Sequence, residues 1–165
     1  MPLRIPMNLI EIERKFLVKD DSFKDEAKSC DHITQGFLSS HPKRVVRVRL
    51  INDKGFLTVK GKSKKNSFTR FEWEREINRE EATALLNLCE KGVIEKKRYY
   101  VEVGKHMYEV DEFLGKNKGL TIAEVELQSE EEEIIKPTWL GKEVTGKKRY
   151  YNSQLSKKPF TTWKN

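Results

Sequence analysis

The sequence has few cysteines, few histidines and no long hydrophobic run. Cys30 and Cys89 show no metal-ligand spacing and do not indicate the disulfide framework of a secreted protein. His32, His41 and His106 also lack ligand spacing, so we assign them no role. No stretch approaches the roughly 20 apolar residues of a membrane span, and the N-terminus lacks the apolar core of a signal peptide. We therefore expect a soluble, cytoplasmic protein.

Charge, in contrast, is abundant. The chain has 33 Lys and Arg against 26 Asp and Glu, which gives a formal net charge of +7. A basic excess of this size suggests an anionic partner: nucleic acid, membrane headgroups or a phosphorylated small molecule. With 165 residues the chain can build a core without disulfide bonds. We expect a single domain over residues 1–165, in which residues 1–6 are an N-terminal extension.

Alternation of apolar and polar residues with a period of two dominates the chain and predicts eight strands. The predicted strands cover residues 8–19, 31–39, 43–51, 55–62, 67–78, 93–103, 106–113 and 120–128. Helices are predicted at 22–29 and at 79–91, where Leu85, Leu88 and Cys89 share a face. The acidic run at 130–133 is interpreted as a solvated helix end, followed by short helices.

The order of these elements repeats once along the chain. Glu11-x-Glu13-Arg14 in the first strand has an echo in Glu72-x-Glu74-Arg75 in the fifth, and each stands just before a helix. Two similar β-α-β-β-β halves are therefore expected. Eight antiparallel strands can close into a barrel, which removes exposed strand edges. The predicted fold class is α+β: an eight-stranded antiparallel β-barrel with peripheral helices.

The predicted strands carry their charges on one face and segregate them by sign. The basic pairs are Arg47 with Arg49, Lys60 with Lys62, and Lys96 with Arg98; the acidic pairs are Glu11 with Glu13, Glu72 with Glu74, and Glu124 with Glu126. For one strand alone, the simplest interpretation is a face that meets water. A barrel that closes with its apolar face outward would instead place all these charges in the lumen. Buried charges persist there only if they are paired or bind a ligand of opposite sign.

Such a lumen suits a particular ligand. A ring of Lys and Arg favours a polyanion with several phosphates, which Arg contacts through two hydrogen bonds and Lys as a point charge. Carboxylates in the same lumen would repel this polyanion unless a divalent cation such as Mg²⁺ or Mn²⁺ bridges the two. The combination indicates metal-assisted phosphoryl chemistry. A protein that only bound nucleic acid would have little use for the glutamates, so neither nucleic acid nor a membrane is the expected partner.

Seven short motifs follow one another in order. They are Glu11-Ile-Glu13-Arg14-Lys15, Arg47-Val-Arg49, "TVKG" with Lys60, "RFEWE" with Glu72 and Glu74, Lys96-x-Arg98-Tyr99, "EVDEF" with Asp111, and "AEVEL" with Glu124 and Glu126. Together they resemble the CYTH, or triphosphate tunnel metalloenzyme, superfamily over residues 8–155. The tail "WLGKEVTGKKRYYNSQL" resembles that of the short bacterial tripolyphosphatase-like members. One departure is Lys97, where many relatives have Thr; we expect this side chain to point outward.

The resemblance implies a tunnel that binds a triphosphate lengthwise and requires Mg²⁺ or Mn²⁺. It implies phosphate-binding roles for Lys15, Arg47, Arg49, Lys60, Lys96 and Arg98. It implies metal-binding roles for Glu11, Glu13, Glu124 and Glu126, with Asp111 and Glu72 or Glu74 assisting. A helix at about 148–155 would lie near one tunnel mouth. Tyr150, Tyr151 and Asn152 are interpreted as packing and capping residues, although one of them could reach the mouth.

The expected reaction is hydrolysis of a terminal phosphoryl group without a covalent enzyme intermediate. Glu13 and Lys96 are the candidate catalytic residues. Lys96 would accept a proton or orient water, because crowding by Arg98 should lower its pKa, or else it is one more phosphate ligand. Inorganic tripolyphosphate is the first substrate hypothesis. Nucleoside or thiamine triphosphate hydrolysis and ATP cyclisation are alternatives, as is a non-catalytic polyphosphate or RNA binder; a homodimer is one candidate assembly.

Overall fold

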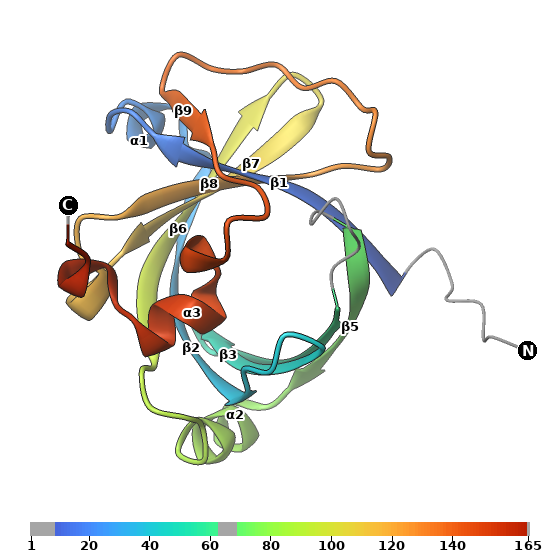
Figure 1. The fold of residues 1–165 in the computed structure, drawn as a ribbon, viewed down its shortest axis with the longest axis vertical. Coiled ribbons are helices and arrows are strands. Elements are labelled where there is room, and N and C mark those ends of the chain that lie inside the picture. Colours follow the sequence, from blue (N-terminus) through green and yellow to red (C-terminus); the bar gives the residue numbers. More distant parts are fainter. Residues whose placement is uncertain (1–8, 63–68, 165) are drawn as a thin grey trace, which may run out of the picture.

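Eight antiparallel strands close into a barrel in the computed structural model, which describes residues 9–62 and 69–164 (Figure 1). The strands are β1 (Ile10–Val18), β2 (Ser29–Ser39), β3 (Arg44–Ile51), β4 (Lys54–Gly61), β5 (Thr69–Ile77), β6 (Ile94–Val103), β7 (His106–Phe113) and β8 (Thr121–Glu126). Neighbours follow the order β5-β4-β3-β2-β6-β7-β8-β1, and β1 also pairs with β5. The predicted fold class is confirmed. The predicted extension at 1–6 lies outside the described residues.

Strand β1 closes the barrel by pairing with a different neighbour along each part of its length. Its first residues pair with β5, as at Ile10 with Phe71, and later residues pair with β8, as at Lys15 with Glu124. The Glu-x-Glu motif of β1 therefore lies where the two halves of the chain meet. Each half has the order β-α-β-β-β, as the sequence echo predicted.

The larger of the two hydrophobic clusters of the described residues lies outside the barrel. Val101, Val110 and Val125 point outward from β6, β7 and β8 into this cluster. Phe23 of α1 (Phe23–Glu26) and Trp139, which are both fully buried, cover these side chains. Because successive side chains of a strand alternate, burying the apolar face outside turns the charged face inward. The closure predicted from the charge pattern is therefore confirmed.

Both predicted helices are shorter than expected. Helix α1 has four residues, and α2 (Arg79–Leu86) ends well before residue 91. Asn78 and Glu81 start α2 with reciprocal side-chain-to-backbone hydrogen bonds. Beyond α2 the chain turns back to β2, where the Glu90 N–H donates to the Phe37 carbonyl. Leu88 lies in this turn and is 74% exposed, so its predicted place on the apolar helix face is wrong.

A ninth strand, β9 (Leu140–Glu143), was not predicted, because the sequence indicated only helices after residue 129. It pairs with the end of β1, and Gly141 allows close approach, since a Cβ atom there would lie 2.9 Å from the Leu17 carbonyl oxygen. The acidic run at 130–133 forms a turn followed by irregular backbone, not a helix end. Its Glu132 carboxylate meets the buried His106 ring and so fastens this segment to β7.

The tail after β9 forms three short helices across one end of the barrel. They are η3 (Lys148–Tyr150), α3 (Asn152–Lys157) and η4 (Phe160–Thr162), and α3 lies across part of the ring in Figure 1. Tyr151 has an extended backbone and divides the helix predicted at 148–155. Leu155 is fully buried against Ile94 and Phe113, which holds α3 at the barrel. None of the helices in the described ranges is long and apolar enough to cross a membrane.

An ion pair joins β9 to β1. Arg14 donates to Glu143 through Nε at 2.9 Å and through a terminal nitrogen at 2.6 Å, and these hydrogen bonds lower the pKa of Glu143. The stabilisation is therefore present above the ordinary Glu pKa of 4.5 and lost as pH falls through the lowered value. We expect Glu143→Gln to cost about 1 kcal/mol or less at pH 7, because the carboxylate is partly exposed, and nothing in acid.

Urea unfolding at pH 7 and below pH 4 measures this difference. Glu131→Gln, at an exposed position, is the matched control and should change stability at neither pH. An equal loss of stability for Glu143→Gln at both pH values would contradict the ion-pair explanation.

Candidate active site

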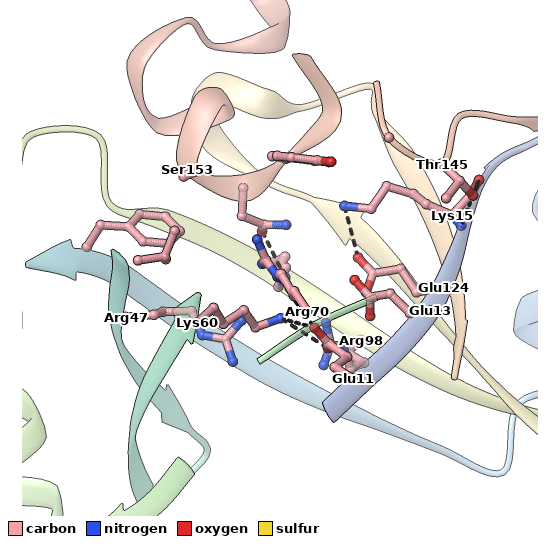
Figure 2. A pocket seen from close by; sticks show the side chains of 16 residues that line it. Glu11, Glu13, Lys15, Arg47, Lys60, Arg70, Arg98, Glu124, Thr145 and Ser153 are labelled. Atoms are coloured by element: carbon pink, nitrogen blue, oxygen red, sulfur yellow. Dashed lines mark hydrogen bonds and ion pairs between the residues drawn. The ribbon is translucent and has the colours of Figure 1, made fainter. Parts of the chain in front are cut away.

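The lumen of the barrel is lined by charged side chains from both halves of the chain. Every predicted site residue except Asp111 lines it. Figure 2 shows Lys15, Glu13 and Glu124 gathered on one side, with Lys60 reaching Glu11. The strands place these residues two apart, as the alternation predicted. Lys62 is an exception in the basic pairs, because it lies beyond the end of β4 and is exposed.

The charges of the lumen are distributed unevenly along its length. The part next to the tail, which we call the basic half, has six Lys and Arg against three Glu. The opposite part, the acidic half, has seven Glu against four Lys and Arg. The two halves share Glu11, Glu13, Arg47, Lys60, Arg98 and Glu124, so they are continuous. A polyanion is favoured in the basic half, and a cation is favoured towards the acidic half.

Glu11 is held by two cations of the lumen. Lys60 Nζ lies 2.9 Å and 3.1 Å from its two oxygens, and Arg70 lies at 3.7 Å. Burial alone would raise the pKa of Glu11, but attraction to Lys60 and Arg70 outweighs it and lowers the pKa to about 2. Glu11 is therefore ionised at any physiological pH.

The pKa of Glu13 is shifted in the opposite direction. Burial, together with repulsion by Glu11 and Glu124, raises its pKa well above the ordinary value. In the same way, burial and the charge of Glu11 raise the pKa of Glu72 to about 7. These carboxylates lack the positive charge that would keep them ionised, and a divalent cation would supply it.

Oxygen donors of this kind suit Mg²⁺ or Mn²⁺. Among the residues that the structure describes, no three Asp, Glu, His or Cys side chains converge as a complete metal site. The donor set fits an ion that takes only a few protein ligands and completes its shell with phosphate oxygens and water, as Mg²⁺ commonly does.

Arg47 and Arg49 are the cations least satisfied by the protein. Within the described part of the chain, the only carboxylate that forms an ion pair with them is Glu74, at 3.7 Å from Arg47 and 3.5 Å from Arg49. The Nε atoms of both arginines are buried without a hydrogen-bond partner there. Burial and the neighbouring charges of Arg47 and Arg98 lower the pKa of Arg49 to about 9. Buried guanidinium donors without partners indicate that an anionic ligand completes them.

Lys96 and Arg98 are fixed by Asp111. Arg98 donates to both Asp111 oxygens, at 2.7 Å and 2.9 Å, and Lys96 Nζ lies 2.7 Å from one of them. Lys96 is fully buried and also donates to Asn152 Oδ1 at 3.0 Å. Burial first, and then the charges of Arg98 and Arg49, lower the pKa of Lys96 to about 7. The predicted direction agrees, although burial is a larger cause than crowding by Arg98.

Sequence reasoning missed several residues of the lumen. Arg70 lies two residues before Glu72, so strand alternation alone would have found it. Gln35 is fully buried and donates to Asn152 Oδ1 at 2.9 Å, but an uncharged residue of β2 gave no signal. Asn152 and Tyr151 line the basic half, with the Tyr151 ring 5.3 Å from Lys15 Nζ. Their interpretation as packing and capping residues alone is therefore incomplete.

Thr145 marks the mouth of the basic half. It accepts a hydrogen bond from the Lys15 N–H at 2.9 Å and lines the lumen beside residues of α3. Lys97 does not line the lumen in the described residues; it is exposed, as predicted. The tail thus covers one end of the lumen with side chains that can donate hydrogen bonds.

Comparison with known proteins agrees with the motifs. A family model described as the CYTH domain matches residues 9–159. The chain is 49% identical over 155 residues to an inorganic triphosphatase of Acetivibrio thermocellus, which covers 93% of this chain and 97% of that protein. It is 33% identical over 152 residues to an inorganic triphosphatase of Nitrosomonas europaea, with 90% and 97% covered.

A solved crystal structure of an inorganic triphosphatase has the same fold. It matches with a TM-score of 0.63 and 31% identity, over 88% of this chain and 93% of that chain. The family model spans most of the sequence, and the relatives align over nearly their full length. The resemblance drawn from the seven motifs is confirmed, and the chain belongs to the CYTH domain family.

Proposed function

We propose that the protein hydrolyses linear inorganic triphosphate inside the barrel, with Mg²⁺ or Mn²⁺ as the required ion. The observation that carries the proposal is a lumen with charges of both signs. Two buried arginine Nε atoms in it have no hydrogen-bond partner among the described residues, and burial and repulsion by other carboxylates raise the pKa of Glu13. Relatives that align over nearly the whole chain are named inorganic triphosphatases. The protein is accordingly a phosphoanhydride hydrolase.

The basic half is the proposed phosphate site. Its ligands are Lys15, Arg47, Lys60, Lys96 and Arg98, with Arg49 beside them in the acidic half. Guanidinium groups contact phosphate oxygens through paired hydrogen bonds and fix the chain lengthwise, and the lysines neutralise the remaining charge. Most of the rate enhancement would come from this positioning and charge stabilisation.

The proposed metal ligands are Glu11, Glu13, Glu124 and Glu126, with Glu72 and Glu74 assisting. A divalent ion bound there would neutralise phosphate oxygens and polarise the phosphoanhydride bond. Asp111 has a different proposed role, because it does not line the lumen and its oxygens contact Arg98 and Lys96. It positions these two cations for the phosphates.

The tail favours an inorganic substrate over an organic one. Thr145, Gly146, Tyr151 and Asn152 line the mouth of the basic half. A nucleoside or thiamine attached to the triphosphate at this end would have to displace them. Lys96, whose pKa of about 7 makes both protonation states accessible, either holds a phosphate as an ammonium group or receives a proton from the attacking water as an amine.

Phosphate release from four substrates tests the proposal: tripolyphosphate, ATP, thiamine triphosphate and pyrophosphate, each with Mg²⁺, Mn²⁺ or a chelator. We expect tripolyphosphate to be cleaved fastest, since it spans the cations of the lumen without an organic group at the mouth. Pyrophosphate should be cleaved slowly because it is too short to contact all of them. Equal rates with and without chelator, or faster cleavage of ATP than of tripolyphosphate, would overturn the proposal.

A further inference from the structure

The last part of the chain forms an exposed surface that carries positive charge alone. Residues 145–164 contain six Lys and Arg and no Asp or Glu. η2 (Gly115–Asn117) joins this surface, because Thr161 of η4 donates to the Lys116 carbonyl at 2.7 Å. We define the tail surface by its eight exposed cations: Lys116, Lys118, Lys147, Lys148, Arg149, Lys157, Lys158 and Lys164. Within the described residues, none of them forms an ion pair with a carboxylate.

A hollow of about 400 Å³ lies on the tail surface, lined by Arg149, Gln154, Lys158 and Trp163. The Arg149 guanidinium lies 3.7 Å over the Trp163 ring, and the Trp163 indole N–H donates to the Lys158 carbonyl at 2.9 Å. These contacts fix Arg149 against the hollow without neutralising its charge. The two cations that line the hollow therefore favour an anion there.

Trp163 is the aromatic residue that lines this hollow, and another side chain already covers one of its faces. Arg149 covers a face of Trp163, and Tyr150 and Phe160 contact the ring in edge-to-face geometry, at 5.4 Å and 5.1 Å between centroids. Proteins that bind single-stranded nucleic acid stack bases on aromatic rings with free faces. The tail surface thus offers many lysines around one ring with a covered face, which favours an anion made of phosphates alone.

Helix α3 connects the tail surface to the lumen. Asn152 and Ser153 line the basic half, whereas Gln154 of the same helix lines the hollow. We propose that the tail surface binds linear inorganic polyphosphate, holding the part of a long chain that extends beyond the lumen. Entry of the chain end into the lumen rests on the proposed function, but binding to the tail surface does not.

The test compares two variants that each lose three positive charges. The tail variant carries Lys148→Gln, Lys157→Gln and Lys158→Gln, all at exposed positions without ion pairs in the described structure. The control variant carries the same substitution at three exposed lysines elsewhere: Lys54 in β4, Lys97 in β6 and Lys105 in the turn after β6. Both variants have the same net charge, so a general effect of charge cancels.

Binding of long-chain polyphosphate is measured by calorimetry in chelator on both variants, whose lumen residues are unchanged, so that binding in the lumen contributes equally to both. We expect the tail variant to bind about tenfold more weakly than the control, because each exposed charge contributes only a small factor. With metal present, KM for long-chain polyphosphate should rise in the tail variant, while kcat/KM for triphosphate stays the same in both variants.

Equal polyphosphate affinity of the two variants would overturn the proposal. So would single-stranded RNA of similar length that binds the wild type as tightly as polyphosphate does, since the surface would then be a nucleic-acid site. Failure of the proposed function would be a separate result. In that case the protein would not hydrolyse triphosphate, but it would still bind polyphosphate in chelator, and the tail variant would still bind it more weakly than the control.

Discussion

Glu13→Gln is expected to lower kcat for triphosphate by at least about 10²–10³-fold at saturating metal. Glutamine keeps the shape of the side chain but cannot carry the negative charge that a divalent cation requires. Glu13 lies between Glu11 and Glu124, and their repulsion, together with burial, raises its pKa well above the ordinary value. The ion would hold Glu13 in the charged state, and the substitution removes that state.

The metal-free protein gives a second measurement on the same variant. Since burial and repulsion by Glu11 and Glu124 raise the pKa of Glu13 and favour its neutral form without metal, the neutral glutamine should change metal-free stability little. Added Mg²⁺ or Mn²⁺ should raise Tm of the wild type, because ligands that bind the native state stabilise it. The same addition should raise Tm of Glu13→Gln much less.

Glu76→Gln is the control for both measurements, because Glu76 lies further along β5 and is exposed. It should keep its activity and its response to metal. Full activity of Glu13→Gln, or an unchanged rise in Tm with metal, would remove Glu13 from the metal ligands. A large loss of metal-free stability would instead show that Glu13 is ionised before the ion binds.

The barrel was predictable because each of its eight strands separates charge from apolar surface. In β6, for example, Lys96 and Arg98 alternate with Tyr99 and Val101, so period two was visible without any structure. Strand β9 gave no such signal, since it has four residues and includes Gly141. Its pairing depends on the edge of β1, which is a tertiary contact that local sequence does not encode.

The site residues that lie on the strands were also predictable from the alternation of charged and apolar side chains. Residues on strands follow from alternation, and even the missed Arg70 obeys it. Asn152 could not be found in this way, because it reaches the lumen through the packing of α3 and not through a strand. Gln35 contacts Asn152 across the barrel, so its role also depends on where the tail folds. The tail's contribution thus needed the three-dimensional structure.

Lys96→Gln separates the two roles left open for this lysine. The Lys96 ammonium can donate three hydrogen bonds, and Asp111 and Asn152 accept two of them, so one is left for a phosphate oxygen. A neutral amine would keep both protein contacts and present a lone pair to water instead. A bound polyanion favours the charged form. We therefore expect the ammonium to be the active form and Lys96 to bind phosphate.

The pH dependence of kcat/KM reports the free enzyme, in which the pKa of Lys96 is about 7. Below this pH the side chain is charged, and above it the charge is lost. Lys96→Gln should therefore lower kcat/KM by about 10²-fold at pH 6, as expected for one well-placed charge, and by much less at pH 9. Lys97→Gln, at the exposed neighbouring position, should follow the wild type throughout.

A loss of activity in Lys96→Gln that grows with pH would instead show that Lys96 accepts a proton. If the neutral amine takes the proton of the attacking water, wild-type kcat/KM rises through pH 7, and the activity lost in Lys96→Gln grows with pH.

The two roles of Lys96 also differ in which kinetic constant the substitution changes. A lysine that binds the triphosphate equally in the ground and transition states affects KM, whereas one that accepts a proton during the reaction affects kcat. Because Asp111 and Asn152 hold Lys96 Nζ in place without substrate, the distinction depends on the protonation state of this nitrogen and not on a movement of the side chain.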